Sequence, residues 1–174
     1  DPRRGRAEMP RRFSVRADSP APVAAVLGAF GDARYWRDRF TEFGGGLELT
    51  ALDVDDAGAI SVRTVQDVRR ESMAPLLARL YPRELRVLAT ERWFPVGDSA
   101  DGTITVTVQG APGAGEAAAR LDAADRGCVL RVDGEVRVRV PVLGGPVERL
   151  VAHGFAAHVP ELQRFTDEWL AAHA

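Results

Sequence analysis

The sequence contains no lysine, because all 23 of its basic residues are arginine. The absence excludes Schiff-base catalysis and any phosphate-binding loop that depends on a lysine. Cysteine is nearly absent too. The single Cys128 excludes an intramolecular disulfide and a cysteine-based metal cluster within one chain. Cys128 lies in a strand pattern, so we expect a small buried side chain and not a reactive thiol.

The chain also lacks a charge excess and a long apolar run. Its formal net charge is −2, which gives no electrostatic attraction to nucleic acid, and we expect no nucleic-acid partner. No stretch approaches the roughly 18 apolar residues of a membrane helix, so we expect no integral membrane association. Residues 1–10 have neither apolar periodicity nor the apolar core of a signal peptide. We expect them to form a flexible leader, with Met9 as an alternative start, on a cytoplasmic protein.

What is present is the composition of a folded domain. Hydrophobic residues make up 45% and charged residues 28% of the 174 residues, close to the ordinary globular mixture. A chain of this length can bury roughly 70% of the surface that its unfolded form exposes. No internal repeat appears, and residues 11–174 are expected to form a single domain.

The first part of the chain predicts one strand and two short helices. Residues 11–16 alternate apolar and polar side chains, which is typical of a strand. Ser19, followed by a proline, predicts the start of a helix, and Asp32 predicts the start of a second. Gly44 to Gly46 breaks that second helix. The glycine run is either a helix-to-strand connector or a flexible rim of a pocket.

The middle of the chain predicts antiparallel strands. Apolar and polar side chains alternate in segment after segment, separated by turn residues, with a short helix at 72–81. The glycine-rich segment 110–115 is a turn and not a phosphate loop, since no lysine follows it. The alternating segments are 47–51, 60–68, 85–94, 103–109, 116–124 and 128–140.

A long amphipathic helix is predicted from near Gly145 to the C-terminus. In a projection at 100° per residue, an apolar stripe occupies an arc of about 140°. His158 falls within that stripe, whereas His153 falls on the opposite, solvent-facing side, and the two cannot share a metal ion. The stripe is Leu150, Val151, Phe155, Leu162, Phe165 and Trp169; the opposite face is Arg149, His153, Arg164 and Asp167.

This order of elements resembles the START-like (SRPBCC, helix-grip) superfamily over residues 11–172. The likeness is carried by FSVRADSPAPVAAVLGAF, RVDGEVRVRVPVLGGPVERL and FTDEWL. It implies an α+β fold in which a curved antiparallel sheet of about seven strands wraps around a long C-terminal helix, with two short helices after the first strand. Within the superfamily, the chain is similar to a bacterial family of unknown function.

The resemblance implies an apolar cavity between the sheet and the last helix, used in the superfamily for lipids, polyketides and other hydrophobic ligands. Thr64 and Gln66 lie on the apolar side of their strand and point into such a cavity. One face of the next strand carries two arginines, so the opposite face, with Glu91 and Trp93, is expected to point inward. The candidate ligand pocket is Thr64, Gln66, Glu91, Trp93, Phe155, His158 and Leu162.

The two titratable candidates have more than one interpretation. His158 is a hydrogen-bonded core residue, a ligand contact or a catalytic group. Glu91 is a member of a salt bridge with an arginine near the rim, or the acid that partners His158. We assign no catalytic residue, metal ligand or cofactor from the sequence.

Three functions compete. The first is the binding or carriage of a hydrophobic small molecule, lipid or polyketide-like, in the cavity. The second is a cyclase or dehydratase that uses Glu91 and His158 in the same cavity. The third is a protein-interaction module with a collapsed cavity, which exposed Leu76, Leu77 or Leu80 would favour.

Overall fold

The structure, a computed structural model, describes residues 10–44, 46–68, 75–80, 84–139 and 144–174. The strands are β1 (Arg11–Ser19), β2 (Leu47–Val54), β3 (Ile60–Val68), β4 (Leu85–Val96), β5 (Ser99–Gln109), β6 (Gly113–Ala123) and β7 (Cys128–Val138). The helices are α1 (Val23–Phe30), α2 (Ala33–Phe43), α3 (Pro75–Leu80) and α4 (Gly144–Ala172).

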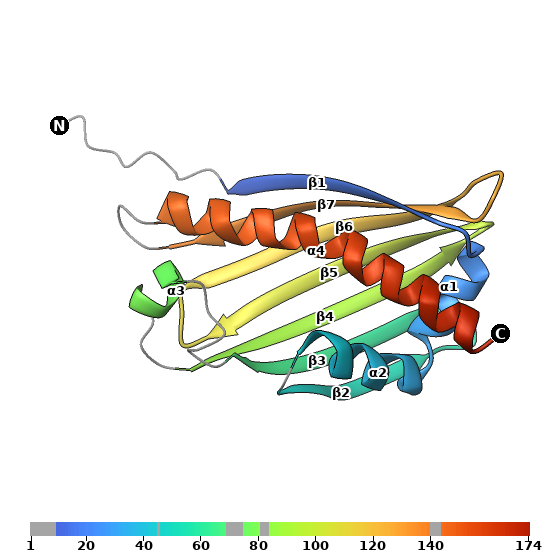
Figure 1. Ribbon diagram of the computed structural model, residues 1–174, viewed down its shortest axis with the longest axis horizontal. Coiled ribbons are helices and arrows are strands. Elements are labelled where there is room, and N and C mark those ends of the chain that lie inside the picture. Colours follow the sequence, from blue (N-terminus) through green and yellow to red (C-terminus); the bar gives the residue numbers. More distant parts are fainter. Residues whose placement is uncertain (1–9, 45, 69–74, 81–83, 140–143) are drawn as a thin grey trace.

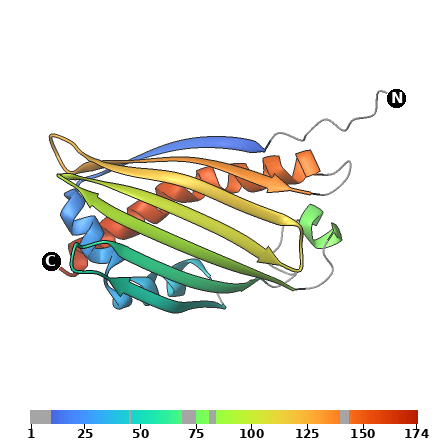
Figure 2. The same cartoon turned by 180° about the vertical axis from the view of Figure 1, so that it is seen from behind.

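These strands form one antiparallel sheet in the order β1-β7-β6-β5-β4-β3-β2. Figure 1 shows α4 crossing one face of the curved sheet, with α1 at one end and α2 beside β2 and β3. Figure 2, from behind, shows the opposite face of the sheet with these helices on its far side. The predicted α+β helix-grip architecture is therefore confirmed.

One end of the space between sheet and helices is filled by aromatic side chains. Trp93 on β4 lies against Phe30 of α1, with ring centroids 5.0 Å apart, and Tyr35 of α2 lies edge-on to Trp169 of α4 at 5.5 Å. Trp93 is cross-strand from Gly102, where a Cβ atom would lie 2.7 Å from the indole ring. Glycine at that position lets the ring lie directly on the sheet. We call this aromatic core the packed end.

The start of the first helix differs from the prediction. β1 continues to Ser19, and α1 begins only at Val23, with Pro22 as its N-cap and no side-chain cap. The Ser19 hydroxyl accepts a hydrogen bond from the Ala21 amide and donates one to Asp167 of α4. The serine thus ties the end of β1 to the last helix, whereas Asp32 does cap α2 as predicted, accepting from the Arg34 amide.

The projection of α4 was correct for most positions and wrong at two. Leu150 is 39% exposed although it was placed in the apolar stripe. Asp167, placed on the solvent side, is half-buried and accepts hydrogen bonds from Ser19 and Gln163. A helical projection uses only the hydrophobicity of each residue. It cannot identify a carboxylate such as that of Asp167, whose burial is compensated by hydrogen bonds from neighbouring side chains.

Several predicted segments fall partly or wholly outside the described residues. These are the leader at 1–9, Gly45, the ends of the predicted helix at 72–81, and the junction at 140–143.

Candidate ligand-binding cavity

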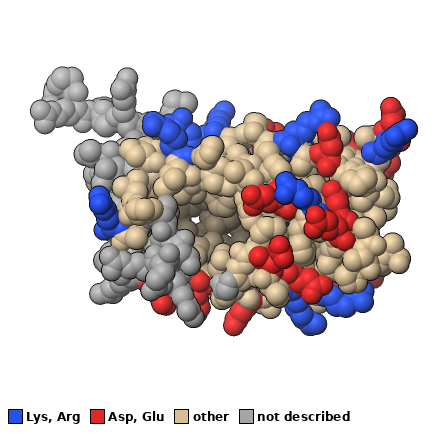
Figure 3. Space-filling view, in the orientation of Figure 1, with Lys and Arg blue, Asp and Glu red and all other residues tan. Residues whose placement is uncertain are grey.

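A cavity of about 250 Å³ lies between the sheet, α2 and α4. It adjoins the packed end, and Figure 3 shows the surface hollowed near the middle of the face that carries α4. Most of its lining is apolar, and the polar side chains in it are few. This combination is typical of sites for small molecules.

Small residues occupy several inward positions on the floor of the cavity. Ala89 on β4, Gly115 on β6 and Ala117 on β6 all line it. Cross-strand pairing places Ala89 beside Val106, and Val106 beside Gly115, in one continuous row across the sheet. A larger side chain in this row would occupy the space directly.

Two helices supply the walls through the same spacing. Four residues of α2 and four of α4 line the cavity at positions i, i+3, i+4 and i+7, which form one face of a helix. The position i+3 is polar in both quartets. The quartets are Trp36, Arg39, Phe40 and Phe43, and Phe155, His158, Val159 and Leu162. They meet where the rings of Phe43 and His158 are in edge contact, with centroids 5.1 Å apart.

The main charged feature of the cavity is a pair formed by Arg39 and Glu91. The Arg39 Nη2 atom lies 3.8 Å from the Glu91 Oε1 atom, and the two side chains are only 15% and 16% exposed. The guanidinium of Arg39 also lies over the Trp36 ring, 4.7 Å from its centroid, in a cation–π arrangement. The other carboxylate oxygen of Glu91 accepts a hydrogen bond from the Trp93 indole at 3.3 Å.

His158 has different surroundings. Its side chain is 41% exposed, and its Nδ1 atom lies 3.4 Å from the carboxylate of Glu161, one turn further along α4. His153 is exposed, as the helix phase predicts. His158 and Glu91 both line the cavity, but each has its own charged neighbour.

Six of the seven candidate pocket residues line the cavity. They are Thr64, Gln66, Glu91, Phe155, His158 and Leu162. Trp93 is not among the lining residues; it is buried in the packed end, directly behind Glu91. Its inward orientation is as predicted, but it supports Glu91 and does not face the cavity.

Sequence reasoning did not find the α2 wall or the contribution of β1. Phe13 of β1 lines the cavity and stacks on Phe155, with ring centroids 6.1 Å apart. For α2 a signal was available, because an arginine at position 39 interrupts an otherwise apolar stripe through Trp36, Phe40 and Phe43. For Phe13 the sequence contains no comparable signal, because the place of β1 in the sheet depends on which strand pairs with β7.

The Gly44 to Gly46 segment is a connector at the cavity's edge. Gly44 is the C-cap of α2, and Gly46, with φ of 77°, directly precedes β2. The side chains on either side of it, Phe43 and Leu47, both line the cavity. The connector interpretation is confirmed for the two described glycines.

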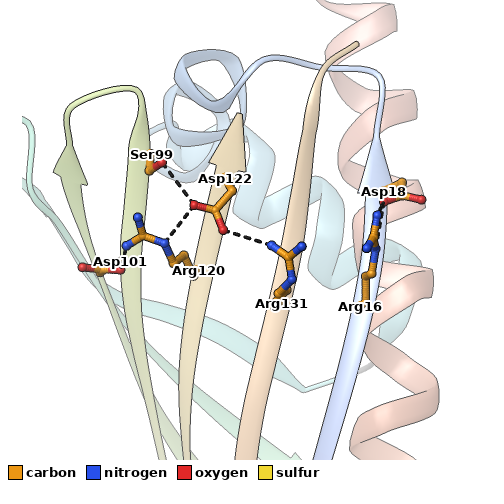
Figure 4. Close-up of polar contacts among 7 residues, drawn as sticks. All are labelled: Arg16, Asp18, Ser99, Asp101, Arg120, Asp122 and Arg131. Atoms are coloured by element: carbon orange, nitrogen blue, oxygen red, sulfur yellow. Dashed lines mark hydrogen bonds and ion pairs between the residues drawn. The ribbon is translucent and has the colours of Figure 1, made fainter. Parts of the chain in front are cut away.

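The outer face of the sheet carries a separate network of charges (Figure 4). Arg120 donates to Asp101 at 2.6 Å and to Asp122 at 2.8 Å, and Arg131 donates to Asp122 at 3.0 Å. Arg120 and Arg131 are direct cross-strand neighbours, so the carboxylates offset the repulsion between them. Desolvation acts to raise the pKa of Asp122, but the hydrogen bonds from Arg120 and Ser99 and the charges of Arg120 and Arg131 outweigh it, and the pKa is lowered.

Cys128 is 1% exposed, as expected for a small buried side chain. Burial raises the pKa of its thiol. Among the described residues, no three His, Cys, Asp or Glu side chains are grouped to hold a metal ion, and none of the described helices is long and apolar enough to span a membrane.

The architecture is a START-like, helix-grip fold. Among solved structures, TTHA0849 from Thermus thermophilus is similar, with a TM-score of 0.60 and 17% identity, over 95% of this chain and 99% of that one. Human STARD10 gives a TM-score of 0.58 and 11% identity over 95% of this chain and 66% of that one. A START superfamily protein from Mycobacterium smegmatis is similar with a TM-score of 0.51 and 13% identity, over 95% of this chain and 99% of that one.

The chain belongs to the family described as "Protein of unknown function (DUF2505)", whose model matches residues 14–170. It is 32% identical over 172 residues to the "Uncharacterized protein Rv0481c" of Mycobacterium tuberculosis (strain ATCC 25618 / H37Rv), covering 93% of this chain and 98% of that protein. The match to the "Uncharacterized protein Mb0491c" of Mycobacterium bovis has the same identity and coverage.

Proposed function

We propose that this protein binds a small, largely apolar molecule in the cavity between the sheet and α4. The observation that carries the proposal is the cavity itself, about 250 Å³ in volume, with alanine, glycine and aliphatic side chains on its floor and mostly aromatic and aliphatic side chains in its walls. Desolvation of an apolar ligand on such a surface is favourable by about 25 cal/mol per Å² of apolar area buried.

The volume sets the size of the ligand. An apolar cavity of roughly 150 Å³ is enough to bind benzene, and drug-sized ligands occupy sites of about 300 Å³ or more. At about 250 Å³, this cavity suits a molecule of one or two rings, or a short branched chain. A lipid with two long acyl chains does not fit within it.

Binding is favoured over catalysis by the partners of the two titratable candidates. Glu91 pairs with Arg39, and His158 lies beside Glu161, so neither is positioned by the other. General acid–base chemistry needs the two groups to converge on one substrate atom within hydrogen-bond reach. We therefore place the cyclase or dehydratase interpretation second.

The interaction-module interpretation has less support. Leu76 of α3 is packed against a second apolar cluster that contains Val136 and Val147. The structure does not describe the side chains of Leu77 and Leu80. Leu76 therefore packs inside this fold and does not form an exposed surface for another protein.

Two measurements test the proposal. Native mass spectrometry of protein purified without detergent, followed by organic extraction, identifies any molecule that co-purifies. Calorimetric titration of the extracted protein with naphthalene then measures binding directly, and we expect saturation at one molecule per chain.

The matched variants are Ala117→Leu, which fills the cavity floor, and Ala118→Leu on the exposed face of the same strand. Naphthalene binding should fall at least about tenfold in the first and stay unchanged in the second. No binding by the folded wild-type protein, or equal binding by both variants, would refute the proposal.

A further inference from the structure

The side chains of Arg39 and Glu91 lie too far apart to form a hydrogen bond with each other. The 3.8 Å between Nη2 and Oε1 is longer than a hydrogen bond, although both side chains are withdrawn from solvent. A guanidinium has five N–H donors, and a carboxylate has about four acceptor positions. Partly buried groups of this kind are normally hydrogen-bonded, so the pair has capacity for a third partner.

Both members of the pair are held in place by a tryptophan. Trp36 lies under the Arg39 guanidinium, and its own indole N–H is fixed by a 2.8 Å hydrogen bond to the Phe30 carbonyl. Trp93 donates to Glu91 from behind. Neither charged group therefore needs to reorganise when a ligand arrives, which lowers the entropic cost of binding.

Four polar residues of the cavity come from α2, β3 and β4. Thr64 on β3 lies diagonally across from Glu91 on the neighbouring strand β4, Gln66 is the next inward position along β3, and Arg39 comes from α2. The opposite side, from β5 to β7 and β1, contributes mostly apolar and small residues such as Ile104, Val136 and Phe13. Glu116 of β6 and Glu135 of β7 also border the cavity there, but they alternate along their strands with the inward Gly115 and Val136, so their side chains point to the outer face of the sheet. A ligand with one polar end would thus have a single preferred orientation.

We infer that the Arg39–Glu91 pair binds an uncharged hydroxyl group at the polar end of the ligand. A hydroxyl is both acceptor and donor, so its oxygen can accept from Arg39 while its hydrogen is donated to Glu91. A carboxylate in the same place would lie against the carboxylate of Glu91, and like charges in a site of low solvent exposure repel strongly. The inference rests on the proposed function, because it assumes that the apolar part of the ligand fills the cavity.

Three probes of one shape test this inference: 2-naphthol, 2-naphthoate and naphthalene, titrated calorimetrically at pH 7. Hydrogen bonds to charged groups predict that 2-naphthol binds about tenfold or more tightly than either of the other two. Glu91→Gln removes the repelling charge and should raise the affinity for 2-naphthoate at least about tenfold. Glu168→Gln, on an exposed carboxylate of α4 that does not line the cavity, is the matched control and should leave the order unchanged.

The possible results separate the two proposals. If none of the three probes binds, both the proposed function and this inference are wrong. If naphthalene binds as tightly as 2-naphthol, or if 2-naphthoate binds tightest to the wild type, the cavity binds ligands but the hydroxyl assignment is wrong. Arg39→Met, in which 2-naphthol should lose its advantage over naphthalene, provides a second test if Glu91→Gln melts at a much lower temperature than the wild type.

Discussion

The two ends of the space beneath α4 are built from the same strands and differ in side-chain volume. In the packed end, β4 contributes Trp93 and β6 contributes Leu121, both buried. In the cavity, the same two strands contribute Ala89 and Ala117. The backbone continues through both ends without a break in the sheet. Small side chains at these two positions therefore help to open the cavity, and no gap in the sheet is needed.

The contacts between α2 and α4 are also more buried in the packed end than in the cavity. In the packed end, the Tyr35 hydroxyl and the Thr166 hydroxyl are joined by a buried 2.7 Å hydrogen bond. In the cavity, the corresponding contact is the edge of Phe43 on the half-exposed ring of His158. We expect the packed end to supply most of the stability and the cavity end to supply the binding site.

Removal of the largest ring from the packed end should have the largest effect. Trp93→Ala leaves a void over Gly102, and we expect a loss of about 3 to 5 kcal/mol in the free energy of unfolding, measured with urea. Phe94→Ala, on the neighbouring side chain that is 43% exposed, should change stability by less than about 0.5 kcal/mol. Equal losses in the two variants would contradict the proposed division of roles.

The helix-to-helix contacts give a smaller, paired prediction. Tyr35→Phe removes the buried hydrogen bond to Thr166 and should cost about 1 kcal/mol. His158→Leu in the cavity wall should cost less than about 0.5 kcal/mol. A double-mutant cycle of Tyr35→Phe with Thr166→Val isolates the hydrogen bond, and a coupling energy near zero would show that the bond does not stabilise the packed end.

The charged network behind the packed end should have the smallest effect, and one that depends on pH. The pKa of Asp122 is lowered from its ordinary value of 3.8, so its contribution to stability is present above that pH and is lost as the pH falls through the lowered value. We expect Asp122→Asn to melt slightly below the wild type at pH 7. The difference should shrink in high salt and vanish in strong acid. A difference that grows on acidification would contradict this assignment.

Much of the fold was predictable because it follows from periodicity. The alternation of β4 placed Glu91 and Trp93 on the inner face, and the helical phase separated His158 from His153, since both arguments use only the geometry of one element. The limits of α1 were missed because Ser19 is used in a tertiary contact with Asp167, which overrides its local tendency to cap a helix.

The cavity lining was only partly predictable, for a related reason. A strand pattern shows which side chains share a face, but not whether a small residue such as Gly115 marks a turn, a bend or open space. The role of Arg39 depends on Glu91, which is distant in sequence and is brought near it only by the packing of α2 on the sheet. Pairings of this kind are set by tertiary structure, which the pattern of a single element does not contain.

The most direct test compares leucine at two alanines of β6 that point to the same side of the sheet. Ala117 lines the cavity, and Ala119, two residues further, is buried in the packed end. We predict that Ala117→Leu keeps its stability to within about 0.5 kcal/mol and loses naphthalene binding, whereas Ala119→Leu loses about 1 to 3 kcal/mol and still binds when folded. Equal destabilisation by both substitutions, with binding retained in Ala117→Leu, would contradict the account.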